Sequence, residues 1–285
     1  MMRKKPMLAY PVSNKPIDYS KPVFIQPKLD GVRCVIQYNP KAPPEETGIT
    51  AYSRTGKEWK NINHILEQLK PFFRKYPNVI LDGELYNHDL KDDFEKIISL
   101  VRKTKPTDED RIESAEMVQF HCYDTIMEHM SYDQRNEFIN QALMLIPSVH
   151  IVDTNMLFRE DDAKVYHRRN LDAGYEGSIV RTNDLYKCGR SWSLRKFKDF
   201  HDAEAILTSW VEGKGKRKGT IGKFIAVDTD GNEFGIPVMD KFEYLQKNFK
   251  KMQGWVGKTA TFIYFERTKA GSYRHPLFKC IRNYE

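Results

Sequence analysis

The sequence is poor in cysteine and has no long apolar run. Its four cysteines lie far apart, with no Cys-x-x-Cys pair, which excludes a zinc ribbon or a redox dithiol built on that spacing. No apolar segment approaches the roughly 20 residues that a membrane-spanning helix needs. The basic first residues lead only into the short run 7–10 before Pro11, so we expect no secretory signal, no membrane partner and an intracellular location. The cysteines, which we expect to be reduced thiols, are Cys34, Cys122, Cys188 and Cys280.

Repeats and low-complexity tracts are also missing, which excludes a solenoid and a long disordered segment. What the chain does have is charge: 46 Lys and Arg residues against 39 Asp and Glu residues give a formal net charge of +7. This excess favours a polyanionic partner, although many soluble proteins carry a similar one. With 40% hydrophobic residues the chain can build one large core, or a larger and a smaller one, so we expect at most two domains.

Short β-rich runs alternate with helical patterns from residue 23 onward, as expected for mixed sheets covered by helices. Asp30-Gly31 separates the first two strands and predicts a tight β-hairpin, since Asp-Gly is a strong hairpin signal. The predicted strands are residues 23–29, 32–38, 49–53, 79–86, 117–126, 177–181 and 192–198. The predicted helices are residues 62–74, 92–103, 132–145 and 161–173.

The pattern changes after residue 200. Three strand candidates are separated by turns and by a single helical stretch, residues 241–251. These strand candidates are residues 203–211, 219–227 and 259–266. We therefore predict an α+β fold in which a larger domain of residues 1–200 precedes a small β-barrel of residues 201–285.

Charged residues gather at the ends of the predicted strands of the larger domain. Each segment alone has an ordinary structural explanation, since carboxylates and lysines on strands are commonly solvated or paired at an edge. Solvation does not explain why a lysine, two glutamates and several further cations all stand at strand ends, which indicates one site with a lysine nucleophile. The segments are 28–33 (KLDGVR), 53–56 (SRTG), 81–85 (LDGEL), 175–181 (YEGSIVR) and 194–198 (LRKFK).

In this order the segments resemble the motifs of the covalent nucleotidyltransferase superfamily of polynucleotide ligases and capping enzymes, from about residue 26 to residue 198. Residues 274–278 (RHPLF), followed by Ile281 and Arg282, resemble the last motif of ATP-dependent DNA ligases, which an OB-fold domain carries. A chain this short is similar to the small viral and bacteriophage ligases. The resemblance implies an adenylation domain with mixed and antiparallel sheets, followed by an OB-fold domain.

The resemblance also implies a reaction. Lys28 would attack the α-phosphate of ATP to form lysyl-AMP, and the AMP would then pass to DNA before the nick is sealed. Glu84 would hold the ribose, and both Glu84 and Glu176 would serve Mg²⁺ binding, with Mn²⁺ as a substitute. Lys196 and Lys198 would contact the α-phosphate and neutralise its developing charge. These five residues are the predicted catalytic set.

Further residues are assigned by their positions in the motifs. Arg181 stands where family members usually have lysine, and residues 283–285 replace the acidic residue and lysine that end many relatives; both differences bear on the adenylation step. A DNA contact is implied for Arg33. Apart from the motifs, the dense basic loop of the second domain, Lys214, Lys216, Arg217 and Lys218, is either a solvated turn or, as we expect from its location, a contact with the DNA backbone. The residues implied in nucleotide binding besides the catalytic set are Gln26 at the base edge, Tyr123 on the adenine, Arg33, Arg54, Arg181, and Arg274 at the β- and γ-phosphates.

The motifs leave sister activities open, namely an RNA ligase or a GTP-dependent mRNA capping guanylyltransferase. A non-enzymatic OB-type DNA-binding protein is a further alternative, although pure binding would not require the set of lysines and glutamates described above. The preferred interpretation is a monomeric ATP-dependent DNA ligase that acts on nicked duplex DNA in replication, repair or recombination.

Overall fold

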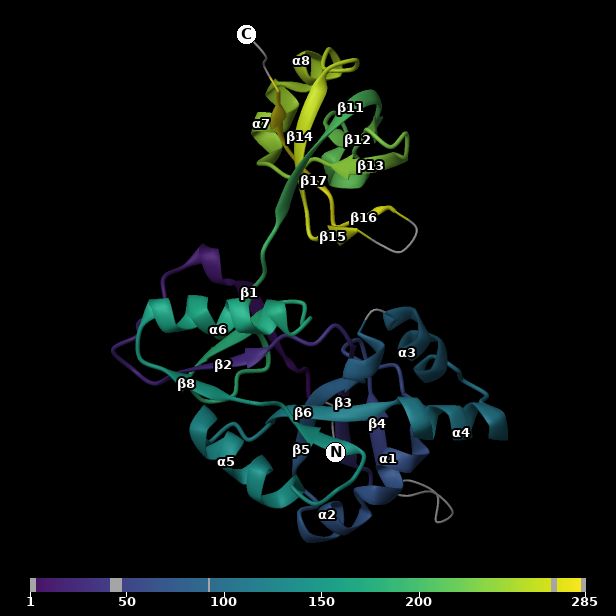
Figure 1. Ribbon diagram of the computed structural model, residues 1–285, viewed down its shortest axis with the longest axis vertical. Coiled ribbons are helices and arrows are strands. Elements are labelled where there is room, and N and C mark those ends of the chain that lie inside the picture. The colour runs from purple at the N-terminus through teal and green to yellow at the C-terminus, as the bar shows by residue number, and fades with distance from the viewer. Residues whose placement is uncertain (1–3, 42–47, 92, 268–270, 283–285) are drawn as a thin grey trace. The chain divides into compact units, whose positions relative to one another are not determined.

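The computed structural model describes residues 4–41, 48–91, 93–267 and 271–282. The chain divides into two compact units, Met1–Phe197 and Lys198–Glu285, whose helices and strands are labelled in Figure 1. Within the described ranges, none of the helices combines the length and the apolar character that crossing a membrane requires.

One sheet of the first unit joins strands from both ends of that unit. Its order is β1-β10-β9-β2-β8, in which β1 is parallel to β10 and the other neighbours are antiparallel. Because β2 and β9 are neighbours, the residues that follow β2 meet those that precede β9. The strands are β1 (Met7–Pro11), β2 (Val23–Pro27), β8 (Asn155–Leu157), β9 (Ser178–Thr182) and β10 (Gly189–Phe197).

The second sheet of this unit has the order β4-β3-β5-β6-β7, with only β6 and β7 parallel. Alternation along β5 sends Leu81 and Leu85 into the main apolar core and leaves Asp82, Glu84 and Tyr86 on the opposite face. This opposite face therefore carries the carboxylates. The strands are β3 (Val32–Tyr38), β4 (Ile49–Tyr52), β5 (Ile80–Tyr86), β6 (Gln119–Thr125) and β7 (Val149–Ile151).

Helices cover the core face of this second sheet. The predicted helix 62–74 is two short helices, because Pro71 lacks the N–H that a continuous helix would use. The helix at 108–117 was not predicted: it buries only Ser114 among its residues and so lacks an apolar period, although Thr107 and Asp110 form a capping box at its start. These helices are α1 (Asn63–Gln68), α2 (Lys70–Lys75), α3 (Phe94–Val101), α4 (Asp108–Met117) and α5 (Tyr132–Leu143), whereas α6 (Glu160–Asp172) packs on the first sheet; 3-10 turns lie at η1 (Val12–Asn14) and η2 (His88–Leu90).

The hairpin predicted at Asp30-Gly31 is wrong. β2 pairs with β8 and β9, whereas β3 pairs with β4 and β5, so the chain passes from one sheet to the other at this point. Gly31 is required by space rather than by a turn, since a Cβ there would lie 2.5 Å from the Leu85 carbonyl oxygen and 2.6 Å from Glu84 Cγ. The missing side chain lets the segment after Lys28 pass directly against β5.

The second unit is built around an antiparallel sheet of order β13-β12-β11-β14-β17, whose edge strands also contact each other as in a barrel. The predicted helix 241–251 is again two helices, which contribute Leu245 and Met252 to the core. The elements are β11 (His201–Glu212), η3 (Gly215–Arg217), β12 (Ile221–Val227), β13 (Glu233–Pro237), α7 (Phe242–Lys247), α8 (Phe249–Gln253), β14 (Thr259–Tyr264), β15 (Glu266–Arg267), β16 (Tyr273–Arg274) and β17 (Leu277–Ile281).

Candidate active site

Lys28 lies just after β2 and is held by the segment that precedes β9. Its backbone N–H donates to the Gly177 carbonyl at 2.9 Å, and the Glu176 N–H donates to the Lys28 carbonyl at 3.1 Å. Gly177 also lets the end of β10 pass close to this segment, because a Cβ there would lie 2.3 Å from the Phe197 carbonyl oxygen. The Lys28 ammonium forms an ion pair with Glu176, and its side chain is 22% exposed. The fold thus joins two of the predicted catalytic residues and leaves the lysine open to solvent.

Glu84 lies on the carboxylate face of β5, opposite Arg33 on β3. The Tyr123 hydroxyl donates to Glu84 Oε2 at 3.0 Å. Burial raises the pKa of Glu84 to about 7, even though the charges of Arg33 and Lys28 and the Tyr123 hydrogen bond favour the carboxylate. A carboxyl group with such a pKa changes its charge near neutral pH, close to the candidate nucleophile.

The raised pKa of Glu84 predicts a pH-dependent stability. The folded protein holds this proton more tightly than the unfolded chain, so the stabilisation is present below the ordinary pKa of 4.5 and is lost as the pH rises through 7. Glu84→Gln is expected to remove this loss, which amounts to up to about 3 kcal/mol at about 1.36 kcal/mol per pKa unit. Urea unfolding from pH 4 to pH 8 measures it, with the exposed Glu116→Gln as control. Identical pH profiles for wild type and Glu84→Gln would contradict the prediction.

Lys196 lies close to Lys28. Burial lowers the pKa of Lys196, and the positive charges of Lys28 and Arg190 lower it further. Two neighbouring amines can both contact one phosphate group and neutralise its charge. Lys198 was expected to end the predicted strand 192–198, but β10 ends at Phe197 and Lys198 belongs to the second unit. There its ammonium lies 4.0 Å from the centre of the Phe265 ring.

Arg33 is anchored beneath Tyr123 by a buried carboxylate. Its Nε and Nη2 donate to the two oxygens of Asp82 at 2.6 and 2.5 Å, and Nη2 also donates to the Met7 carbonyl at 3.1 Å. The Tyr186 hydroxyl donates to the same carboxylate at 2.6 Å. The guanidinium lies 5.0 Å from the centre of the Tyr123 ring. Arg33 therefore positions Tyr123, and its implied nucleotide and DNA contacts stay predictions.

Gln26 and Arg181 belong to a second buried network centred on Asp124. Arg181 Nη1 donates to Asp124 Oδ2 at 2.7 Å, and Arg135 Nε donates to Asp124 Oδ1 at 2.7 Å. Arg181 Nε donates to Gln26 Oε1 at 2.7 Å, and Gln26 Nε2 donates to the Thr154 hydroxyl at 2.9 Å. The guanidinium that replaces the usual lysine is thus used to fix Gln26, the residue implied in reading the base.

Sequence reasoning missed four members of these networks: Asp82, Asp124, Arg135 and Tyr186. Asp82 could have been predicted, because side chains alternate along a strand, and the alternation that places Glu84 on one face of β5 places Asp82 on the same face. No comparable signal marked Asp124 or Arg135. A buried arginine on α5 has the same sequence signature as an exposed one until the carboxylate that pairs with it is known.

The remaining predicted residues lie outside this cluster of contacts. Arg54 is exposed in the turn 53–57 after β4. In the second unit Arg274 on β16 pairs with Glu266 on β15. Of the basic loop, Arg217 is partly buried and donates to the Val238 carbonyl at 3.2 Å, whereas its three lysines are exposed. The C-terminal residues 283–285 lie outside the described residues.

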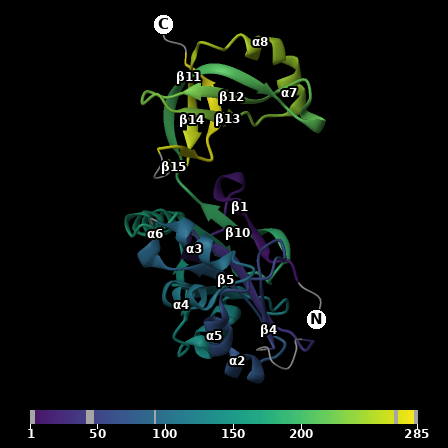
Figure 2. The ribbon, with the colours of Figure 1, turned by 90° about the vertical axis from the view of Figure 1, so that its right-hand side faces the viewer.

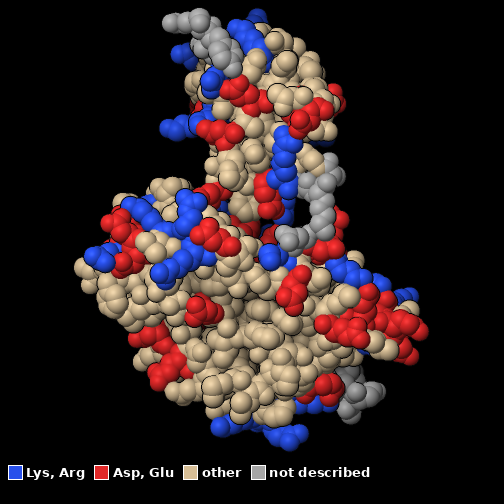
Figure 3. All heavy atoms as spheres, viewed as in Figure 1, with Lys and Arg blue, Asp and Glu red and all other residues tan. Residues whose placement is uncertain are grey.

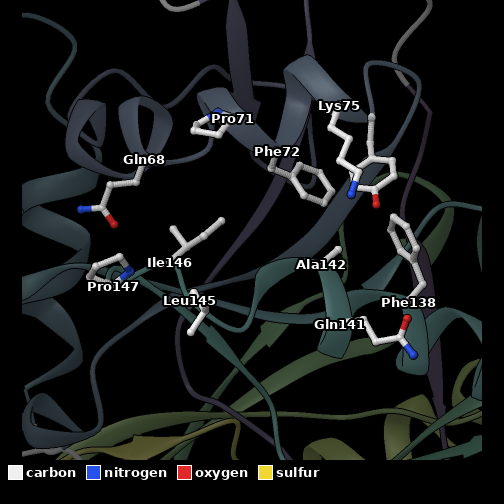
Figure 4. Close-up of a pocket in the computed structure, with 11 residues that line it drawn as sticks. Gln68, Pro71, Phe72, Lys75, Phe138, Gln141, Ala142, Leu145, Ile146 and Pro147 are labelled. Carbon is white, nitrogen blue, oxygen red and sulfur yellow. The ribbon is translucent and has the colours of Figure 1, made fainter.

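A groove of about 600 Å³ lies between α2 and α5. Figure 4 shows the Phe72 and Phe138 rings that help to line it, together with Lys75. None of the predicted nucleotide-binding residues lines this groove, and its mixed polar and apolar walls offer no carboxylate. It therefore lacks the groups that adenylation chemistry requires.

Glu176 and Glu84 are the carboxylates available to a divalent cation at this site. Among the described residues, no group of three or more His, Cys, Asp or Glu side chains could hold a metal ion together. Mg²⁺ keeps several waters and takes only one or two protein carboxylates at phosphate sites, so these two residues fit it.

Two family models match the chain. Residues 6–198 match the ATP dependent DNA ligase domain, and residues 212–282 match the DNA ligase OB-like domain. The DNA ligase of African swine fever virus is 30% identical over 208 residues, which cover 70% of this chain and 47% of the viral protein. The DNA ligase of Enterobacteria phage T4 is 25% identical over 232 residues, which cover 67% of this chain and 47% of the phage protein. The chain thus spans about half the length of the curated relatives it matches.

Solved structures are similar over almost the whole chain. A Lig E DNA ligase has a TM-score of 0.77 at 23% identity, covering 99% of this chain and 100% of its own. The ATP-dependent DNA ligase of bacteriophage T7, in complex with ATP, has a TM-score of 0.54 at 18% identity and covers 98% of both chains. At these identities the similarity establishes the fold. The predicted fold class, a nucleotidyltransferase domain with mixed and antiparallel sheets followed by an OB-like domain, is confirmed.

Proposed function

Because the chain belongs to the family of ATP-dependent DNA ligases, we propose that it uses ATP to join the 5′-phosphate and 3′-hydroxyl at a nick in duplex DNA. The observation that carries this proposal is the pairing of Lys28 with Glu176, with Lys196 beside them. A solvent-accessible amine next to a carboxylate and a second cation is what attack on a phosphate requires.

In the first step, Lys28 Nζ attacks the α-phosphorus of ATP. An N–P bond forms, the bond from the α-phosphorus to the bridging oxygen breaks, and pyrophosphate leaves with that oxygen. Lys28 is an ammonium in its ion pair with Glu176, so it loses one proton before the attack and a second as the N–P bond forms; both pass to solvent, to which its side chain is 22% exposed. The AMP then passes to the 5′-phosphate at the nick, and the 3′-hydroxyl displaces AMP to close the strand.

The other residues of the cluster support this reaction. Lys196, joined by Lys198, neutralises charge on the α-phosphate as it develops. Tyr123, held between Arg33 and Glu84, stacks on the adenine, and Glu84 holds the ribose. Glu176 and Glu84 would hold Mg²⁺, which would supply further positive charge at the phosphate. Gln26, fixed by Arg181, is placed at the base edge.

The second unit contributes DNA and phosphate contacts in this proposal. Lys214, Lys216 and Lys218 are exposed next to a hydrogen-bonded turn and contact the DNA backbone, whereas Arg217 mainly stabilises the turn. Arg274 contacts the β- and γ-phosphates of ATP, and Arg54 contacts the nucleotide or the 5′-phosphate at the nick. The protein works as a monomer inside the cell, where its substrates are found, and takes part in replication, repair or recombination.

The test is sealing of a 5′-phosphorylated nick in duplex DNA with ATP and Mg²⁺. A nicked RNA duplex and labelling with GTP run in parallel, because the sister activities of the superfamily use those substrates. ATP-dependent joining of the DNA strand is the expected result. Joining of RNA alone, or a GMP adduct without an AMP adduct, would move the protein to a sister activity.

A further inference from the structure

Two aromatic rings stack on the surface of the first unit, at the paired strands β1 and β10. Tyr10 and Trp192 lie with ring centroids 3.8 Å apart and planes 11° apart. Figure 2 shows β1 beside β10, and the two strands pair in parallel. Trp192 is 40% exposed. Part of the Trp192 ring is therefore open to solvent and can be reached by a ligand.

The backbone is shaped to present Trp192. Ala9 pairs with Ser191, but the next residue of β1, Tyr10, pairs with Arg195, so residues 192–194 bulge out of the ladder. Buried Arg195 fixes this bulge: its Nε donates to the Trp192 carbonyl at 2.7 Å, and its Nη1 donates to the Lys15 carbonyl. Bulges of this kind re-aim side chains beside active sites.

Cations flank both rings. Lys15 Nζ lies 6.0 Å from the centre of the Trp192 ring, and the Arg190 guanidinium lies 5.4 Å from that of Tyr10. Both side chains are exposed, and neither forms an ion pair with a carboxylate among the residues that the structure describes. By contrast, Arg33 and Arg181 are neutralised by buried aspartates. The positive charges of Lys15 and Arg190 are therefore available to an anionic partner.

This arrangement adjoins the candidate active site. Lys196 pairs with Pro11 in the same β1–β10 ladder, and the charges of both Lys28 and Arg190 act on Lys196. The positively charged side chains of Lys28, Lys196 and Arg190 are thus successive neighbours. Acidic side chains gather over α4 in Figure 3, where the first turn holds Asp108, Glu109 and Asp110, and a second acidic turn, Glu160, Asp161 and Asp162, begins α6.

We propose that Tyr10, Trp192, Lys15 and Arg190 form a binding site for the sugar–phosphate backbone of the DNA strand next to the nick. This inference rests on the proposed function. The two cations contact successive phosphates, and the exposed ring edges pack against the deoxyriboses between them. The site places the strand so that its reacting end lies towards Lys28 and Lys196. We call these four residues the aromatic platform.

The test is the salt dependence of DNA binding by the full chain. Lys15→Gln/Arg190→Gln is compared with Arg74→Gln/Lys75→Gln, which removes the same charge from α2, where Lys75 also lies over a ring, that of Tyr76. The probe is a fluorescent nicked duplex, titrated by anisotropy from 50 to 300 mM KCl. The platform variant should lose about 1.8 from the slope of log K against log salt, at about 0.9 per phosphate contact. The α2 variant should keep the wild-type slope.

A second pair of variants tests the rings. Trp192→Leu should weaken binding because it removes the ring beside Lys15, and Trp192→Phe should restore most of the affinity. Thermal unfolding of both checks that the bulge is intact; if Trp192→Leu does not fold, the charge variants decide. Equal slopes for the platform and α2 variants would overturn the proposal.

Labelling of wild type with radioactive ATP keeps the two proposals apart. If wild type forms no AMP adduct but the platform variant loses salt dependence, the platform stands and the ligase reaction fails. If wild type forms the adduct and the platform variant binds with an unchanged slope, the reaction stands and the platform fails.

Discussion

Lys28→Ala is expected to abolish transfer of AMP to the protein. The reaction proposed here runs through a covalent bond to Lys28 Nζ, and no neighbouring group replaces it, because Lys196 sits on another strand. Removing a covalent nucleophile typically costs roughly 10⁴-fold or more in rate. The measurement is labelling of the purified protein with α-³²P-ATP, followed by nick sealing with unlabelled ATP. Both activities should fall below detection.

Lys21→Ala is the matched control, since Lys21 precedes the same strand, β2, and its side chain is 78% exposed. It should label and seal like wild type. Lys28→Ala should still bind nicked DNA with nearly wild-type affinity, because one cation is a small share of the contact with a polyanion. An AMP adduct on Lys28→Ala would remove Lys28 from the mechanism, while loss of DNA binding together with labelling would point to misfolding.

Most strands of the first unit could be predicted from the sequence because each has its own apolar period, but β1, β7 and β8, which are only three to five residues long, were not predicted. The pairing partners of the strands could not be predicted. Asp30-Gly31 reads as a hairpin, yet the chain crosses between sheets there, and Gly31 is needed because Glu84 and Leu85 approach it closely. A sequence pattern records that a residue must lack a side chain but not whether a turn or a neighbouring strand demands it. The same limit explains why α4, which has little apolar surface to bury, left no period to recognise.

The candidate site, like the fold, could be predicted only in part from the sequence. The ion pair of Lys28 with Glu176 and the approach of Lys196 follow the motif order, because residues at adjacent strand ends must converge. The supporting charges did not follow from that order. Arg33 and Arg181 were assigned to ligands, whereas the structure pairs them with Asp82 and Asp124. Motif spacing indicates that a cation is present, and only packing determines whether a ligand or a buried carboxylate neutralises it.

Replacing Asp124, at the centre of its buried network of hydrogen bonds, is expected to cause a large loss of stability. Asp124 is fully buried, and its two oxygens accept hydrogen bonds from Arg135 and Arg181, which are themselves buried. Asp124→Asn keeps the shape of the side chain but leaves two positive charges without a counter-charge. Breaking such a buried pair typically costs about 3–5 kcal/mol. Urea unfolding at pH 7 measures the loss, and Asp18→Asn, in an exposed pair with Lys21, should leave the midpoint unchanged.

The same substitution should affect the site, because Arg181 also holds Gln26. With Asp124 neutral, Arg181 is free to shift, and Gln26 loses the donor that orients its amide. Asp124→Asn should therefore raise the ATP concentration needed for half-maximal adduct formation, even at a temperature where the variant is fully folded. A variant with wild-type stability and wild-type ATP dependence would mean that Arg135 and Arg181 are neutralised by other groups, and that Gln26 does not depend on this network.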